Sequence, residues 1–394
     1  MLSLAKRTES LTPSYTIGIS MKVAELREQG KHVINFSVGE PDFNVPEKAK
    51  EEAITAIREN RTKYDKVPGL VPLRKAICEK LQQENHLSYE PEEIVVTNGA
   101  KQAIMNTLNA LVDPGEEVLV PVPYWVSYPE MIKLCGGVPV FVYPKDHKDY
   151  KICAGDLEPY VTEKTKLLFL NNPSNPAGAL YDKKELEDIA AFCLEKQIYI
   201  MSDEVYERFC FDGTYTSIGS LSREIRDMTV LVNGLSKAAA MTGLRIGYTA
   251  STKKIASAIS AMQGHLTSHP ATISQWAAYE ALKDCKDEIN AQLEVYRRRR
   301  DLAMKYLDQM DKITYIRPGG AFYVFINAGA YREAFKGAGS FSVAFCDRLL
   351  EREGVAAVPG IAFGMDDYFR ISYALGTEEL EEGLQKIGSF IKSL

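Results

Sequence analysis

The stretch Leu231-Val-Asn-Gly-Leu-Ser-Lys-Ala-Ala-Ala-Met-Thr-Gly-Leu-Arg-Ile-Gly-Tyr248 runs from an apolar, strand-like segment into a turn of small residues and then into a second strand. The turn presents Ser236 and Lys237, and Arg245 follows. A lysine on a tight turn, beside a hydroxyl and near a second cation, suits an amine that must lose its proton to react with a carbonyl group. Most lysines are solvated surface groups, so the rest of the chain has to decide between these two interpretations.

Outside this stretch, short apolar runs alternate with helical patterns, which is typical of an α/β sheet. The runs are apolar throughout, and this predicts strands covered on both faces, as in a mostly parallel sheet. Seven strands are expected, at Ile94–Thr97, Glu117–Pro121, Val138–Val142, Lys166–Asn171, Ile198–Met201, Met228–Val232 and Arg245–Ala250.

A long helical pattern from Asp287 to Met310 predicts a bridge between two parts of the chain. Residues 47–310 are then expected to form a large domain around the sheet. Residues 1–46, which include an N-terminal arm, and residues 311–394 are expected to form a smaller α+β domain. The basic run Arg297-Arg-Arg-Arg300 has Glu294 and Asp301 beside it, which predicts a solvated helix face.

Composition places the chain among ordinary globular proteins. It has 394 residues, of which 45% are hydrophobic and 25% charged, and its net charge is −6. No basic field across the whole chain favours nucleic acid as a partner. The seven cysteines are odd in number and form no C-x-x-C pair, which indicates free thiols in a reducing compartment. No signal peptide and no membrane-spanning run is recognised, so a cytoplasmic protein is expected.

Metal binding is not expected. His265 and His269 have a spacing of four residues, which suits a metal pair on a helix, but Pro270 follows directly and no third ligand is evident.

Polar residues follow the predicted strands where ligands of an open α/β sheet bind. Asp203 ends one strand and suits a protonated ring nitrogen, although it could also cap a helix. Tyr206 can bring a phenol to the same pocket. Asn175 lies in the loop Asn171-Asn-Pro-Ser-Asn-Pro-Ala-Gly178, whose two Asn-Pro steps are turn chemistry and candidate cis peptides.

Three further signals fit an anionic, planar ligand. Gly99 joins a strand to a helix whose free N–H groups could cradle a phosphate. Trp125 could stack on a flat ring or anchor the core. Arg370 is a lone arginine in an apolar strand pattern and needs an anion, either a bound carboxylate or an internal Asp or Glu. Taken together, these groups describe a site for pyridoxal phosphate bound to an amino acid.

From end to end the chain resembles the class I pyridoxal-phosphate aminotransferases of fold type I. The matching stretches, in order, are Ser37-Val-Gly-Glu-Pro-Asp-Phe43, Lys63-Tyr64, Gly99-Ala-Lys-Gln-Ala103, Pro123-Tyr-Trp-Val-Ser-Tyr-Pro129, Asn175-Pro-Ala-Gly178, Ser202-Asp-Glu-Val-Tyr206, Ser236-Lys237 with Arg245, Gly320-Ala-Phe-Tyr323 and Arg370.

The resemblance implies a role for each matching residue. Lys237 forms the aldimine with the cofactor and later moves the proton, while Asp203 keeps the pyridine nitrogen protonated. Tyr206 and Asn175 hold the phenolic oxygen, and Asn175 also touches the substrate carboxylate. The remaining groups are a phosphate site of Gly99, Ala100, Ser236 and Arg245, a stacking and substrate-contacting Trp125, and a carboxylate grip of Gly39 and Arg370. Tyr64 would reach the phosphate of the other subunit, which implies a homodimer with shared sites.

Within the family, the chain is most similar to the bacterial aspartate aminotransferases that bind the distal carboxylate with lysine. That lysine matches Lys101, which also lies at the cofactor's phosphate end, and the assisting hydroxyls match Ser14 and Thr16. Ala239 and Leu244 stand where larger aromatic residues are usual, which leaves substrate breadth open.

The expected reaction is therefore transfer of the amino group of aspartate to 2-oxoglutarate, which gives oxaloacetate and glutamate by a ping-pong mechanism. The alternatives are an aminotransferase of broader, aromatic or other specificity and a β-C–S lyase that uses the same cofactor. A non-catalytic ligand sensor of a transcription regulator is a third possibility, but it requires an added DNA-binding module for which the chain leaves no room.

Overall fold

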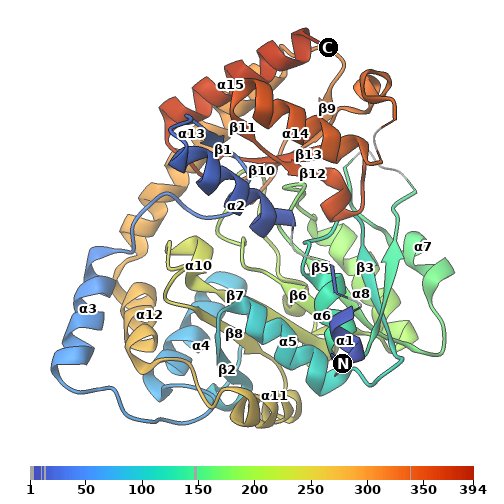
Figure 1. Cartoon of the computed structure of the whole chain (residues 1–394). Helices are drawn as coiled ribbons and strands as arrows, with labels where there is room; N and C mark the ends of the chain where they lie inside the picture. Colours follow the sequence, from blue (N-terminus) through green and yellow to red (C-terminus); the bar gives the residue numbers. More distant parts are fainter. Residues whose placement is uncertain (1–3, 10, 13–14, 146–148, 338) are drawn as a thin grey trace.

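The computed structural model describes residues 4–9, 11–12, 15–145, 149–337 and 339–394 (Figure 1). Its central feature is a seven-stranded sheet in the order β2-β8-β7-β6-β5-β3-β4. The strands are β2 (Ile94–Asn98), β3 (Glu117–Pro121), β4 (Val138–Val142), β5 (Thr165–Asn171), β6 (Tyr199–Asp203), β7 (Thr229–Gly234) and β8 (Ile246–Ala250). Only β8 runs antiparallel to its neighbours. The predicted mostly parallel sheet is confirmed, with strand ends within two residues of those expected.

Helices cover both faces of this sheet, which is why its strands are apolar throughout. Successive side chains of a strand point to opposite faces. Leu231 packs with α4 (Val71–Asn85) and α12 (Thr272–Asp284), whereas its neighbour Val230 packs with α11 (Lys253–Leu266). In the same way, α8 (Lys183–Lys196) covers one face, and α5 (Ala100–Leu111) and α6 (Tyr128–Leu134) cover the other. Asp182 caps α8 by accepting a hydrogen bond from the backbone N–H of Glu185 at 2.9 Å.

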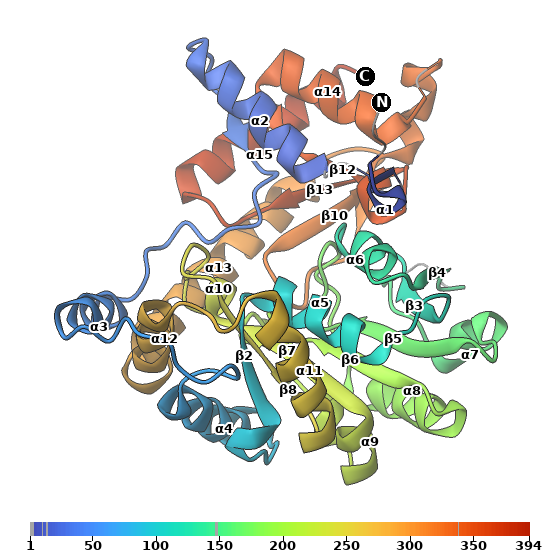
Figure 2. The same ribbon diagram turned by 60° about the horizontal axis from the view of Figure 1, so that its bottom comes forward.

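Both ends of the chain contribute to the two smaller sheets. In one, β1 (Ile34–Asn35) pairs in parallel with β11 (Val355–Ala356). The other has the order β12-β13-β10-β9 and contains β9 (Thr314–Tyr315), β10 (Tyr323–Asn327), β12 (Val358–Pro359) and β13 (Tyr368–Ser372). Figures 1 and 2 show α2 (Tyr15–Glu28), α14 (Phe341–Glu353) and α15 (Thr377–Lys392) gathered around these sheets.

The other helices are short or connect these layers: α1 (Lys6–Glu9), α3 (Glu47–Arg58), α7 (Ala154–Leu157), α9 (Arg223–Met228), α10 (Leu235–Ala238) and α13 (Lys286–Leu307). The long helix α13 packs at both of its ends: Ile289 lies in a core with α4 and α12, and Leu307 lies in a core with α14 and α15. This placement agrees with a bridging helix. The domain boundaries at residues 46 and 311 stay a prediction.

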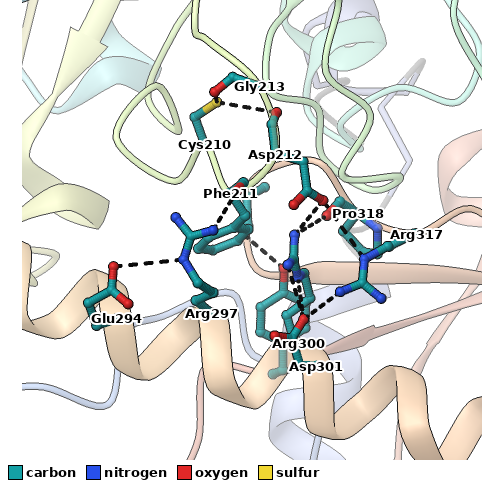
Figure 3. A network of polar contacts seen from close by, with 12 residues as sticks. Cys210, Phe211, Asp212, Gly213, Glu294, Arg297, Arg300, Asp301, Arg317 and Pro318 are labelled. Carbon is teal, nitrogen blue, oxygen red and sulfur yellow. Dashed lines mark hydrogen bonds and ion pairs between the residues drawn. The ribbon is translucent and has the colours of Figure 1, made fainter.

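Two of the four arginines on α13 correct the sequence-based expectation of a solvated face, whereas Arg298 is exposed as expected. Arg299 and Arg300 are buried, with relative exposures of 6% and 2%. Arg299 forms a two-pronged pair with Asp42 at 2.7 and 2.8 Å. Arg300 contacts Asp212 at 2.6 Å in the network of Figure 3. The sequence pattern could not show this, because both carboxylates come from loops far along the chain.

The same network joins α13 to the segment that leads into the small sheets. Figure 3 shows Arg317 beside Asp301, with a contact of 2.6 Å, and Arg297 donating to the carbonyl of Phe211. Arg297 and Arg300 thus connect α13 to the loop that follows Tyr206.

Among the described residues, no helix is both long and apolar enough to cross a membrane.

Candidate active site

A cavity of about 790 Å³ opens at the edge of the large sheet where its parallel strands end. Because β5, β6 and β7 are parallel, the residues at their carboxyl ends meet there. Asn171 ends β5, Asp203 ends β6, and β7 runs directly into α10, which carries Lys237.

The cavity gathers most of the residues that the sequence singled out. Those that line it are Thr16, Gly39, Ala100, Lys101, Trp125, Asn175, Asp203, Tyr206, Ser236, Lys237, Arg245 and Arg370. Gly99 lies just behind them, as the residue before α5. Tyr64 is 92% exposed and does not line the cavity, and Ser14 lies outside the described residues.

Lys237 directs its amine into this cavity. Its Nζ donates to the carbonyl oxygen of Gly39 at 2.5 Å. Burial lowers the pKa of the lysine from 10.5 to about 8, against the opposing influence of Glu40. Positive charge on Arg370 and Arg245 lowers it further. A substantial fraction of the amine is therefore neutral near physiological pH, as a nucleophile or a proton carrier requires.

Asp203 is buried at the end of β6 and serves no helix as an N-cap within the described chain. The hydroxyl of Tyr128 donates to its Oδ2 at 2.6 Å, and the backbone N–H of Val205 approaches Oδ1 at 3.3 Å. Burial raises the pKa of Asp203 to about 6, and the hydrogen bond from Tyr128 is the largest opposing influence. The carboxylate is thus held ready to accept from a cationic donor in the cavity.

In the part of the chain that the structure describes, Arg370 forms no ion pair with an Asp or Glu side chain. Its Nη1 donates to Oδ1 of Asn175 at 3.0 Å, and its Nη2 donates to the carbonyl of Ser37 at 2.7 Å. Both acceptors are uncharged. Its Nε has no hydrogen-bond partner in the described part of the chain, although the side chain is buried. A buried guanidinium without a carboxylate favours a bound anion over the internal Asp or Glu that the sequence left open.

A second part of the cavity, at the start of α5, suits another anion. The helix α5 begins at Ala100, so its first N–H groups face the cavity beside Ser236 and Arg245. Gly99 has φ of +81°, and a Cβ there would lie 2.5 Å from Nη2 of Arg245. Only glycine therefore lets this turn and the guanidinium share the space.

Lys101 and Trp125 form part of the rim. The ammonium of Lys101 lies 4.9 Å from the centre of the Trp125 ring. Burial and the charge of Arg245 lower the pKa of Lys101. Trp125 packs edge-on against Tyr128 with 5.3 Å between ring centres, so it serves both the core and the cavity wall.

Tyr64 lies apart from this cavity, next to His269. The two rings meet edge-on at 5.8 Å, and His269 Nε2 accepts from the backbone N–H of Asp65. Within the described residues, no group of three His, Cys, Asp or Glu side chains is arranged to hold a metal ion.

Sequence reasoning missed several residues of the cavity. Tyr128 and Tyr323 lie in stretches that match the family, but the sequence assigned neither of them a role. Both line the cavity. The helix α2 adds Ile17, Ser20 and Met21, which no motif indicated. Lys237 and Asp203 did carry a signal, because polar residues at strand ends are expected in a ligand crevice. Tyr128, at the start of a helix, and Tyr323, at the start of a strand, carry no comparable signal.

These residues fit pyridoxal phosphate and a bound amino acid. The cavity offers a buried amine, a buried carboxylate that suits a ring nitrogen, a helix N-terminus with an arginine that suits phosphate, and the orphaned Nε of Arg370 that suits a carboxylate. The loop that carries Asn175 has cis peptides at Asn172–Pro173 and Asn175–Pro176. Both Asn-Pro steps are thus cis, as the sequence allowed.

Comparison with known proteins decides the family. Residues 31–387 match the family model for aminotransferase class I and II. The chain belongs to this family. This aminotransferase is 43% identical to a probable aspartate/prephenate aminotransferase from Aquifex aeolicus, over 99% of each chain. It is 41% identical to an aspartate aminotransferase from Geobacillus stearothermophilus, over the full length of both.

The fold of the aminotransferase is shared with solved structures. It superimposes on an aspartate aminotransferase from Thermus thermophilus with a TM-score of 0.93 and 39% identity, covering 99% of this chain and 100% of that one. The enzyme is therefore a transaminase of the fold type I architecture, as its sequence predicted.

Proposed function

We propose that this aminotransferase uses pyridoxal phosphate and transfers the amino group of aspartate to 2-oxoglutarate. The observation that carries the proposal is the convergence of Lys237, Asp203 and Arg370 on one cavity from three separate elements. When bound, pyridoxal phosphate supplies an aldehyde for an amine and a protonated ring that withdraws electrons.

The protein side of the reaction is proton control and orientation. Arg370, with Asn175 beside it, binds the α-carboxylate and so presents the Cα–H bond to Lys237. The amine of Lys237, with its pKa lowered to about 8, would accept this proton and hold it for return to the bound substrate and cofactor. Asp203 would hold the ring nitrogen in its protonated form, and Ala100, Gly99, Ser236 and Arg245 would hold the phosphate. Trp125 would contact the ring, and Tyr206 would donate to its phenolic oxygen.

Lys101 is proposed to bind the distal carboxylate of aspartate, with Thr16 and Ser14 assisting. Lys101 in α5 and Thr16 in α2 both line the cavity. The two named relatives include aspartate in their descriptions, and the Thermus protein was solved with maleate, a dicarboxylate.

A second acceptor, prephenate, is favoured by one specific observation. The helix α2 contributes the apolar side chains of Ile17 and Met21 to the cavity that the cationic Lys101 also lines. Prephenate combines a ring with a carboxylate and fits such a mixed surface. The Aquifex relative, at 43% identity, is described with both aspartate and prephenate.

We also propose a cytoplasmic homodimer with shared sites. Tyr64 supports the shared-site arrangement. It is 92% exposed and does not line the cavity of its own subunit, so its side chain is available to a partner subunit. Exposed apolar side chains at Ile57 and Leu266 are further candidates for the dimer contact.

The test is a survey of half-reactions. The purified enzyme, loaded with pyridoxal phosphate, is mixed with one amino acid at a time, and conversion of the cofactor to its amine form is followed by absorbance. Aspartate and glutamate should convert it fastest, and the amine form should be reoxidised by 2-oxoglutarate and by prephenate. Steady release of a 2-oxo acid from cysteine or cystathionine without an acceptor would identify a β-C–S lyase instead.

A further inference from the structure

We propose that Tyr323 is a positioning residue: its hydroxyl donates to the hydroxyl of Tyr206 and so holds the proton of Tyr206 directed into the cavity, toward the ring oxygen of the cofactor. The proposal rests on the proposed function and assigns a new residue to the same site.

Geometry places the two hydroxyls in direct contact. The oxygens of Tyr206 and Tyr323 are 2.8 Å apart, and both side chains are buried. Tyr206 comes from the loop after β6, whereas Tyr323 begins β10 in the smaller sheet. A tyrosine hydroxyl has a single proton, so only one of the pair donates along this bond. The direction of that bond decides where the other proton points.

The charges of Arg370 and Asp203 favour donation from Tyr323. The guanidinium lies 4.3 Å from the centre of the Tyr323 ring. Burial raises the pKa of both phenols, and Arg370 opposes this rise at both, but the negative charge of Asp203 raises the pKa of Tyr206 further. The more acidic of two hydroxyls is the better donor. Tyr323 therefore gives its proton to the shared bond, and the proton of Tyr206 stays free for the cavity.

Close packing keeps Tyr323 in this position. A Cβ on Gly39 would overlap the hydroxyl of Tyr323, so the absence of a side chain at Gly39 makes room for it. The carbonyl of the same glycine accepts from Lys237. The ring of Tyr323 also packs against Phe322 and Tyr206, with 4.7 and 5.7 Å between ring centres. Tyr323 on β10 thus lies against three residues of the proposed site: Tyr206, Arg370 and Gly39.

The consequence is a stronger donor at the ring oxygen. A hydroxyl that accepts one hydrogen bond donates more strongly through its own proton. Without Tyr323, the proton of Tyr206 would be free to rotate, and the negative charge on the ring oxygen would be less stabilised. Besides the partner tyrosine, Arg370 on β13 and Asp203 on β6 are the charged groups that act on Tyr206.

The test compares Tyr323→Phe with Tyr373→Phe. Tyr373 is buried as well, but its hydroxyl donates to the carbonyl of Ala321, at 3.0 Å. The cofactor-loaded proteins are titrated with acid and base while the visible absorbance is followed, and the Kd of the cofactor is measured separately. We expect Tyr323→Phe to raise the pH at the midpoint of the absorbance change by about half a unit. We expect it also to weaken cofactor binding by about threefold. We expect Tyr373→Phe to change neither.

A double-mutant cycle separates positioning from general damage. In the Tyr206→Phe background, a further change of Tyr323 to Phe should leave the midpoint and the Kd as they are. Equal effects in both backgrounds would overturn the proposal, as would an altered KM for the amino acid with an unchanged midpoint and Kd. A wild-type protein that fails to bind the cofactor at all would instead overturn the proposed function.

Discussion

The hydroxyl of Tyr128 lies 2.6 Å from Oδ2 of Asp203, and both side chains are buried. Tyr128 stands at the first position of α6 and stacks on Phe169 with 4.3 Å between ring centres, so its hydroxyl is held in place. Burial raises the pKa of Asp203 to about 6, and the hydrogen bond from Tyr128 opposes this rise. The bond therefore helps the carboxylate of Asp203 to stay charged near neutral pH.

Replacing Tyr128 by Phe should therefore raise the pKa of Asp203 further. The pH at which cofactor affinity is lost on the acid side is expected to rise by about one to two units, because a hydrogen bond to a charged group contributes about 1.5–3 kcal/mol. Cofactor Kd values measured from pH 5 to pH 9 check this. The control is Tyr124→Phe, whose ring stacks on Phe141. Parallel pH profiles for Tyr128→Phe and wild type would show that the bond does not tune Asp203.

Replacing Lys237 by Met should abolish transamination and stabilise the cofactor-free protein at neutral pH. The folded-state pKa of Lys237 is lowered to about 8 from 10.5, so burial of the charged amine costs stability below pH 8. Between pH 8 and 10.5 the unfolded chain binds more protons than the folded one, and the wild type regains stability. The advantage of the variant in free energy of unfolding should therefore shrink across that range. Urea unfolding at pH 7, 9 and 10.5 measures it, with the 69%-exposed Lys183→Met as control. A constant difference at all three values would contradict the lowered pKa.

Replacing Lys101 by Ala should raise KM for aspartate about tenfold or more and leave KM for alanine and phenylalanine almost unchanged, because only the dicarboxylate loses an ion pair. Steady-state kinetics with the three donors at saturating 2-oxoglutarate test this. Lys133→Ala, on a half-buried lysine paired with Glu130, serves as control. An equal loss for all donors, with weakened cofactor binding, would assign Lys101 to the phosphate alone.

Mixing a Lys237→Ala variant with a Tyr64→Ala variant tests whether the active sites are shared. In hybrids of Lys237→Ala and Tyr64→Ala subunits, one site of each dimer should hold both native residues. If a hybrid forms, about half of the wild-type activity per dimer is expected, because only one of its two sites is intact. Activity is measured after the two proteins are unfolded together and refolded. No recovery, although mass measurement shows hybrid dimers, would place Tyr64 outside the partner's site.

Replacing Asp42 by Asn should destabilise the protein by about 2 kcal/mol, because Arg299 keeps its buried charge and loses its partner. Asp42 is itself 30% exposed, which reduces the expected cost. The matched control is Asp347→Asn, which breaks the exposed pair with Lys22 and should cost less than about 1 kcal/mol. Equal midpoints in thermal unfolding of the two variants would show that burial adds nothing to the Arg299 pair.

Much of the site could be predicted from the sequence, because each residue lay in a local pattern. Asp203 ended an apolar run, Gly99 joined a strand to a helix, and Lys237 lay on a turn of small residues. Strand ends of a parallel sheet meet at one edge, so these local patterns were enough to bring the three residues together.

The other part depended on contacts between distant segments. Whether Arg300 is solvated or buried is decided by Asp212, 88 residues away in sequence, and by the carbonyl of Pro318. Tyr128 and Tyr323 carry no periodic or turn signal, because a tyrosine is equally at home in a core and at a cavity wall.

By itself, then, the sequence determined the α/β sheet and the order of its strands along the chain, and it singled out Lys237 as the candidate for the reactive lysine, because hydrophobic period and turn chemistry are local properties. Only the tertiary structure decided which tyrosine hydroxyls contact Asp203 and Tyr206, that Arg370 has no acidic hydrogen-bond partner among the described residues, and that α2 lines the cavity. These depend on how separate elements pack, and packing brings together side chains whose separation along the chain says nothing about their distance in space.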